Sequence, residues 1–174
     1  MTAGAADERG GKAMSKKSTE TDAFFAAYRA ATGIASTDYE VVAFGDSPAM
    51  ATELALLVRD GPKRATAGLA RYFEDDGDPM PVAGDYVVVI DGAGDPVCVW
   101  RTTEVAVKPL IEVDDAFAYD EGEGDRTRDE WLRMHRDYFR REANRDGFEF
   151  HDQLATVFER FAVVWPVPDA GIKA

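Results

Sequence analysis

The chain has 174 residues, a net charge of −13 and one cysteine. This length suits one domain whose core needs no disulfide or metal, and a lone cysteine excludes an internal disulfide. The acidic balance disfavours long duplex nucleic acid as a partner, because the phosphate backbone is repelled over most of such a surface.

The N-terminal segment, residues 1–19, is rich in small and charged residues and lacks any apolar period, so we expect it to be disordered. The remaining residues, 20–170, are expected to form a single domain. The N-terminus has no apolar signal region, and no segment reaches the ~20 apolar residues of a membrane-spanning helix. We therefore expect a cytoplasmic protein with no membrane partner.

Two helices are predicted in the first third of the domain. Asp22 is expected to cap the first, which ends at Gly33. The second begins with Ser47 as N-cap and Pro48 in the first helical position. Gly61 is expected to close it as a left-handed residue.

Strands follow the second helix. Residues 64–69 are expected to enter a strand, and residues 85–90 are dense in β-branched side chains. The sequence Asp-Gly-Ala-Gly at 91–94 predicts a hairpin turn into a strand over 96–108, with a bulge near Thr102 and Thr103. A last strand is expected at 157–165.

A long helix is predicted between these last two strands. Thr127 and Glu130 match a capping box, and Gly147 is placed to end the helix. Strands joined by hairpins with helices inserted between them indicate an α+β fold, with a small, mostly antiparallel barrel or curled sheet.

The segment Gly61-Pro62-Lys63-Arg64-Ala65-Thr66 is the strongest candidate for chemistry. If the chain enters a strand here, Lys63 and Thr66 lie near one strand mouth, where an amine and a hydroxyl can act as base and nucleophile. This requires a desolvated or cation-rich pocket that favours the neutral amine. The alternative is a solvated lysine in a loop beside an ordinary strand residue.

An acidic segment runs from Glu112 to Asp125 with no Lys or Arg to offset its charge. Crowded carboxylates raise one another's pKa, and a carboxyl group tuned in this way can serve as general acid or base. The segment lacks the residue order of an EF-hand loop. A solvated acidic loop, or a surface that docks a basic partner, are the alternatives.

Aromatic and imidazole side chains are further candidates. Tyr72 is expected to be exposed near the Lys63–Thr66 segment, where its ring could stack on a nucleobase. Trp131 and His135 lie one helical turn apart, with core packing as the alternative for both. Two histidines and one distant cysteine give no metal-ligand spacing, and phosphate-binding and GxSxG motifs are absent, so neither metal nor cofactor is expected.

Several short motifs, taken in order, resemble the ASCH-domain family over about residues 40 to 166. They are Phe44-Gly45-Asp46-Ser47-Pro48, Gly61-x-Lys63-x-x-Thr66, Gly84-Asp85-Tyr86, Thr103-Glu104-Val105 and the segment from Ala118 to Asp125, followed by Trp131, His135 and Phe139. The resemblance implies a PUA-like β-barrel flanked by helices, with a cleft at the barrel mouth.

Within that family, the resemblance implies RNA or a modified nucleoside as partner. Some members are ribonucleases, and one bacterial branch removes the acetyl group from N4-acetylcytidine with a lysine, a threonine and a glutamate. Those residues correspond to Lys63, Thr66 and Glu121, which we take as the catalytic candidates. This chain departs from that branch in Gly68, where the branch has a basic residue, in the extension at 123–125 and in its longer final helix.

The leading hypothesis is therefore an RNA- or nucleoside-directed hydrolase, and the alternative is a non-catalytic module that binds RNA or a nucleotide. In either case we expect substrate contacts from the flanking polar and aromatic residues, namely Arg64, Tyr72, Glu104, Glu123, Trp131 and His135. The sequence carries no signal for an oligomeric state.

Overall fold

The computed structural model describes residues 12–167, which form an α+β fold around one six-stranded sheet. The strand order is β1-β2-β4-β5-β6-β3, and every neighbouring pair is antiparallel except β2 with β4. The strands are β1 (Ala13–Ser15), β2 (Glu40–Ala43), β3 (Ala65–Leu69), β4 (Tyr86–Ile90), β5 (Pro96–Pro109) and β6 (Ala155–Trp165).

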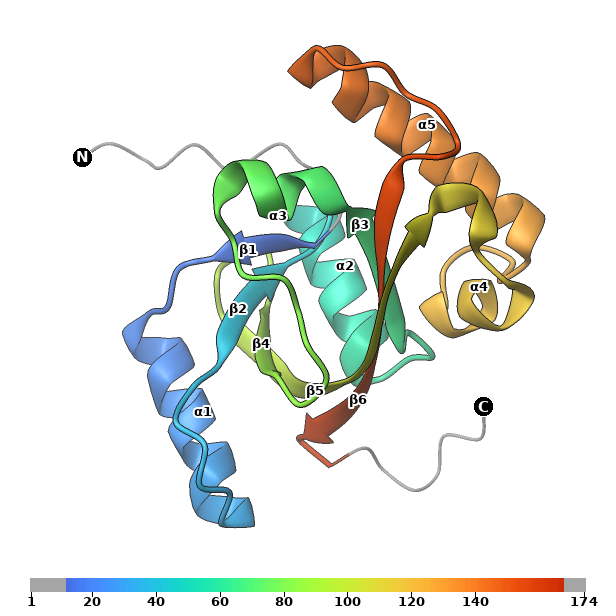
Figure 1. Cartoon of the computed structure of the whole chain (residues 1–174). Coiled ribbons are helices and arrows are strands. Elements are labelled where there is room, and N and C mark those ends of the chain that lie inside the picture. Colours follow the sequence, from blue (N-terminus) through green and yellow to red (C-terminus); the bar gives the residue numbers. More distant parts are fainter. Residues whose placement is uncertain (1–11, 168–174) are drawn as a thin grey trace.

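The predicted hairpin joins β4 to β5. Its turn is closed by backbone hydrogen bonds from Asp91 to Asp95 and from Gly94 to Asp91. The β5 strand then pairs with β6 along most of its length, and the register shifts between Thr102 and Glu104, where a bulge was expected. These two long strands run through the middle of the molecule (Figure 1).

The sheet curls but does not close into a barrel. Within residues 12–167, no ladder joins the edge strands β1 and β3. The sheet nevertheless curls far enough to bring its first strand close to β6. Lys12, next to β1, places its Nζ 2.5 Å from Oε2 of Glu159 on β6. That carboxylate also accepts a hydrogen bond from Thr102 Oγ1 at 2.7 Å. The closed barrel implied by the resemblance is therefore replaced by an open, curled sheet.

Regular structure begins earlier than the sequence suggested. The β1 strand lies inside the 1–19 segment for which we expected disorder, and it forms because it pairs with β2. Helix α1 (Thr19–Thr32) is capped by Ser18, not by Asp22. Asp22 lies in the first turn, where its carboxylate accepts a hydrogen bond from the Tyr39 hydroxyl at 2.5 Å. Residues 1–11 lie outside the described part of the chain.

Helix α2 (Pro48–Arg59) begins as predicted, with the Ser47 side chain accepting a hydrogen bond from Met50 N. Its end differs from the prediction, because Asp60 caps it in a right-handed conformation. Gly61 does not close the helix in a left-handed conformation. A glycine is required there because a Cβ would lie 2.8 Å from the Leu57 carbonyl oxygen. The chain can therefore turn tightly under α2 before it enters β3.

Three helical segments come from stretches that we did not predict as helical. They are α3 (Ala70–Asp76), the 3-10 helix η1 (Leu110–Glu112) and α4 (Asp115–Glu121). The α4 helix occupies the centre of the acidic segment, and Asp114 caps it by accepting a hydrogen bond from Phe117 N. The acidic stretch is thus a short helix with a buried face formed by Phe117 and Ala118.

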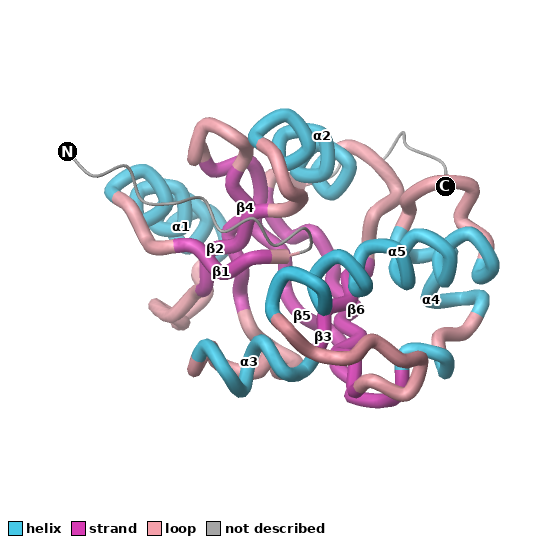
Figure 2. Tube along the Cα trace, turned by 90° about the horizontal axis from the view of Figure 1, so that it is seen from above, coloured by secondary structure: helices cyan, strands magenta, loops and turns pink. Residues whose placement is uncertain are grey.

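The long predicted helix is α5 (Arg128–Asp146), which ends at Gly147 as expected. Only half of the expected capping box forms. Thr127 Oγ1 accepts from Glu130 N, but the Thr127 N–H donates to Asp125 instead of to Glu130. Figure 2 shows α2 and α3 on opposite sides of the strands, with α4 and α5 together beside β3 and β6.

Candidate functional site

A cavity of about 320 Å³ opens where α2, β3, the end of α4 and α5 meet. Its walls combine apolar side chains with charged groups from segments that are far apart in the sequence. The lining residues are Phe44, Gly45, Asp46, Met50, Leu54, Lys63, Thr66, Ala67, Glu121, Glu123, Arg133, Met134, His135, Asp137, Tyr138 and Arg141. The three catalytic candidates are all among them.

Lys63 is buried in this wall and is not a solvated loop residue, since only 1% of its surface is exposed. Its Nζ donates to Glu123 Oε1 at 2.7 Å and to the Glu121 carbonyl oxygen at 3.4 Å. Oε1 of Glu121 lies 3.9 Å from the same nitrogen. The pocket is desolvated, as the base role required, but it is rich in carboxylates where we expected cations, and the Lys63 amine pairs with two of them.

The loop that carries Lys63 is fixed against the end of α4. Arg64 N donates to the Asp120 carbonyl oxygen at 2.7 Å. Gly122 ends α4 with φ +74°, and a Cβ there would lie 2.7 Å from Lys63 N. Only a glycine permits this close approach of the two backbones, which brings the Glu121 carboxyl group next to the Lys63 amine.

Glu121 forms the buried centre of the charge cluster, with 2% of its surface exposed. Its Oε2 lies 3.4 Å from His135 Nε2 on α5. Burial alone raises the pKa of Glu121, but the charges of His135 and Lys63 outweigh burial, so the pKa lies below its ordinary value. For His135 the effects have the opposite signs. Burial lowers the pKa of its imidazole, but the Glu121 charge outweighs burial, so the pKa lies above its ordinary value.

Thr66 lies on β3 opposite Glu159 of β6, and 5% of its surface is exposed. The strand entry that we predicted brings its side chain to the same cavity as Lys63. The amine, the hydroxyl and the carboxyl group expected to work together therefore line one cavity, although 58 residues separate Lys63 from Glu121 in the sequence.

Of the residues expected to contact substrate, Glu123 and His135 line the cavity, and four others do not. Arg64 is turned under α2, where it donates to the Val58 carbonyl oxygen at 2.9 Å. Glu104 has a side chain that is 66% exposed, and it lies 3.9 Å from Arg160.

The two aromatic candidates pack against neighbouring side chains and are not among the residues that line the cavity. Tyr72 on α3 donates a 2.6 Å hydrogen bond to Asp146 and packs near Phe148, at the far end of α5. Trp131 is buried, and its ring stacks on His135 at 3.6 Å with an interplanar angle of 14°. Trp131 thus fixes the plane of the imidazole but does not reach the cavity.

Sequence reasoning missed most of the cavity wall on α5. Met134, Tyr138 and Arg141 line it together, and their spacing of four and three residues places them on one helix face. That spacing could have identified them once Lys63 was known to face α5. Met50 and Leu54 show the same four-residue spacing on α2.

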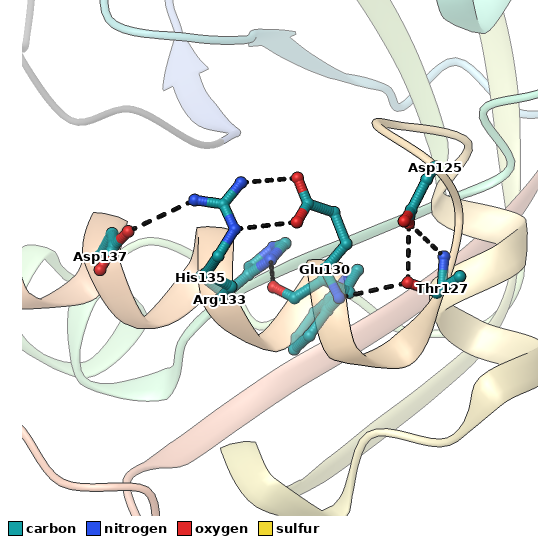
Figure 3. A network of polar contacts seen from close by, with 7 residues as sticks. Asp125, Thr127, Glu130, Arg133, His135 and Asp137 are labelled. Carbon is teal, nitrogen blue, oxygen red and sulfur yellow. Dashed lines mark hydrogen bonds and ion pairs between the residues drawn. The ribbon is translucent and has the colours of Figure 1, made fainter.

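Charged groups on α5 continue from the cavity towards the start of the helix (Figure 3). Arg133 is paired with Glu130 at 2.6 Å and lies 3.7 Å from Asp137. Asp125 accepts hydrogen bonds from both the backbone N–H and the hydroxyl of Thr127. Arg133 is thus balanced by neighbouring carboxylates, and the cavity rim presents no concentrated positive charge.

The carboxylates of the acidic segment form ion pairs with basic residues from other parts of the chain, unlike those of a solvated loop. Glu121 and Glu123 turn towards Lys63, and Asp120 pairs with Arg160. Among the described residues, no group of three or more His, Cys, Asp or Glu side chains is arranged to hold a metal ion. No helix between residues 12 and 167 has the length and apolar character needed to cross a bilayer.

Comparisons with known proteins show which family and which folds this chain resembles. Residues 40–165 match a family model described as ASCH domain. The chain is similar to the crystal structure of an ASCH domain from Lactobacillus crispatus JV V101, with TM-score 0.74 and 31% identity over 82% of this chain and 92% of that chain. A protein from Enterococcus faecalis V583 gives TM-score 0.72 and 29% identity over 81% and 85% of the two chains. No curated protein matches.

Proposed function

Because this chain belongs to the ASCH domain family and its Lys63, Thr66 and Glu121 line one cavity, we propose that it is a hydrolase acting on an acylated nucleoside. The observation that carries the proposal is the buried contact of Lys63 with the end of α4, in a cavity that Thr66 also lines. Burying a charged amine without such partners would be costly, so the cluster is a built feature of the site.

The size and charge of the cavity favour a nucleoside over an RNA strand. At about 320 Å³ the cavity lies at the small end of the range for ligand pockets. Several carboxylates line it, and the whole chain has a net charge of −13. These features oppose the approach of many phosphates but do not oppose an uncharged nucleoside. The base and its acyl group would occupy the cavity.

In the proposed reaction, the Thr66 Oγ attacks the acyl carbon. Lys63 can accept the hydroxyl proton only after it loses one of its own, because an ammonium has no lone pair. The 2.7 Å hydrogen bond to Glu123 supplies a carboxylate to receive that proton. The C–N bond of the substrate then breaks, the released amine takes a proton from the cavity, and the acyl group stays on Thr66.

The second half of the reaction restores the starting protons. Water attacks the acyl carbon, and its oxygen remains in the released acid. One proton of that water replaces the proton given to the amine. Lys63 returns a proton to Thr66 and recovers its own from Glu123. Acid–base assistance of this kind contributes about 10²–10⁴-fold in rate.

One observation favours the second candidate, a non-catalytic module that binds a nucleoside. The Lys63 Nζ already donates to Glu123 and lies 3.9 Å from Glu121 Oε1, so these carboxylates compete with Thr66 for the amine. In that case Lys63 and the two glutamates would recognise the ligand by hydrogen bonding alone.

The test uses matched substitutions at Thr66. With N4-acetylcytidine as substrate, Thr66→Val keeps the shape but removes the hydroxyl, and we expect a loss of about 10²-fold or more in kcat, by analogy with other acid–base contributions. Thr66→Ser keeps the hydroxyl and should retain activity. Lys63→Ala should also abolish hydrolysis.

An RNA substrate and a binding assay separate the alternatives. Cleavage of RNA by the wild type, lost in Lys63→Ala, would replace the nucleoside proposal with ribonuclease activity. Binding of the nucleoside without its hydrolysis would establish the non-catalytic module. Activity of Thr66→Val equal to that of the wild type would eliminate Thr66 as nucleophile.

A further inference from the structure

The orientation of the His135 ring is fixed by four contacts. Trp131 stacks on one face at 3.6 Å, and the ring of Phe139 lies edge-on at 5.7 Å. Nδ1 lies 2.9 Å from the Trp131 carbonyl oxygen, and Nε2 lies 3.4 Å from Glu121 Oε2. Each ring nitrogen thus faces one oxygen atom.

These two contacts determine where the protons lie. A backbone carbonyl oxygen only accepts hydrogen bonds, so Nδ1 must carry a proton to bond to Trp131. In neutral histidine, Nε2 would then present a lone pair to Glu121. Oε2 of Glu121 is buried without a hydrogen-bond partner, and the Trp131 side chain is the other donor near this carboxyl group, so an unprotonated Nε2 would place a second acceptor opposite Oε2. That arrangement is unfavourable, whereas a proton on Nε2 makes it an ion pair.

We propose that His135 is held as an imidazolium paired with Glu121, and that its Nε2 proton is the one delivered to the leaving nitrogen of the substrate. The proton-transfer step rests on the proposed hydrolase function. His135 lines the cavity, so it can reach a bound substrate. This role differs from the ligand contact that the sequence suggested for His135.

The surroundings of the ring support the charged form. The ionisable groups that line the same cavity are Asp46 before α2, Lys63 before β3, Glu121 and Glu123 at the end of α4, and Arg133, Asp137, Tyr138 and Arg141 on α5. Lys63 is itself paired with Glu123, so its charge is largely offset. The raised pKa of His135 and the lowered pKa of Glu121 agree with this assignment.

The proton transfer is balanced as follows. As the C–N bond breaks, the electron pair of that bond stays on nitrogen and takes the proton from Nε2. His135 is then neutral, with Nδ1 still bonded to Trp131. The water that cleaves the acyl-threonine returns a proton to Nε2. Glu121 stays ionised throughout, so it acts as a positioning residue that maintains the imidazolium.

The protonation state is tested directly by ¹⁵N NMR of histidine-labelled wild-type protein between pH 5 and 9. The chain has two histidines, and the exposed His151 provides the reference signal. The signals that disappear in His151→Gln belong to His151, so the remaining histidine signals are assigned to His135. We expect both nitrogens of His135 to remain protonated at pH 7.5. An unprotonated Nε2 at that pH would overturn the proposal, whether or not the protein is an enzyme.

The transfer step is tested by the dependence on the leaving group. His135→Gln keeps an N–H near Glu121 but cannot deliver a proton, so hydrolysis of N4-acetylcytidine should fall about 10²-fold or more. Hydrolysis of 4-nitrophenyl acetate should fall much less, because its leaving group needs no proton. Equal losses on both substrates, or no loss on either, would overturn the donor role.

His151→Gln serves as the activity control and should match the wild type on both substrates. If the wild type hydrolyses neither substrate, the proposed function and the transfer step both fail. The NMR titration then still decides whether His135 is an imidazolium.

Discussion

At the scale of single residues, the site depends on buried charges that stabilise one another. Lys63 and Glu121 each have 2% or less of their surface exposed, and neither could be buried alone without a large desolvation cost. Glu123 and His135 complete the cluster, each placed within ion-pair distance of one of these two. Removing one member therefore leaves a neighbouring buried charge without its partner.

The Glu121–His135 pair predicts how stability depends on pH. The folded pKa of Glu121 lies below its ordinary 4.5, so the stabilisation is lost as pH falls through that folded value. The folded pKa of His135 lies above its ordinary 6.5, so the stabilisation is lost as pH rises from 6.5 towards the folded value. The full contribution is present between about pH 4.5 and 6.5.

We therefore expect the difference in unfolding free energy between wild type and His135→Gln to shrink as pH rises above 6.5. Urea denaturation of both proteins across pH 5 to 9 measures it. A difference that stays constant over this range would show that His135 has the same protonation state when folded and unfolded.

At the scale of elements, the end of α4 positions the site. Gly122 and Gly147 end α4 and α5 in the same left-handed conformation, with φ of +74° and +76°. Their surroundings differ, because a Cβ at Gly147 meets nothing within 4 Å, whereas a Cβ at Gly122 meets the backbone of Lys63 at 2.7 Å. Alanine substitutions at the two glycines therefore distinguish the cost of left-handed backbone strain from the cost of a steric overlap.

Gly147→Ala should cost about 1–2 kcal/mol, the strain of a left-handed non-glycine residue. Gly122→Ala should cost the same strain and a further 1–3 kcal/mol or so, because its methyl group overlaps a neighbouring backbone. Denaturant unfolding measures both, and equal costs would contradict the close approach of α4 to the Lys63 loop. We also expect only the Gly122 variant to weaken nucleoside binding.

At the scale of the whole molecule, the charge distribution limits the ligand. The net charge of −13 is spread over a chain whose cavity is itself lined by four acidic side chains, Asp46, Glu121, Glu123 and Asp137. A ligand that binds through many phosphates would need a basic surface, and the Lys and Arg residues that line the cavity, Lys63, Arg133 and Arg141, are outnumbered by these carboxylates.

Nucleoside affinity should therefore change little between about 50 and 200 mM salt, because no counterions are released from an uncharged ligand. Single-stranded RNA of about 20 nucleotides should bind weakly at the lower salt and lose that binding at the higher. Fluorescence anisotropy and calorimetry measure the two. Tight RNA binding with a steep salt dependence would contradict the nucleoside assignment.

The limits of prediction from sequence follow from the range of the interactions involved. The Ser47 cap, the 91–94 turn and the Gly147 stop depend on neighbours within a few residues, and all three form as predicted. The β1 strand was missed because its pairing with β2 joins residues that are about 30 positions apart in the sequence. Helix α4 was missed because the acidic composition hid the buried face that Phe117 provides.

The sequence by itself determined the α+β class, the positions of the three longest helices and of strands β3 to β6 and, through its motifs, the choice of Lys63, Thr66 and Glu121. Only the tertiary structure decided that the sheet stays open, that Arg64 and Tyr72 point elsewhere and that Lys63 meets two carboxylates. The reason is physical. Local patterns specify which backbone forms are favourable, whereas the protonation and reach of a side chain depend on what packing brings against it.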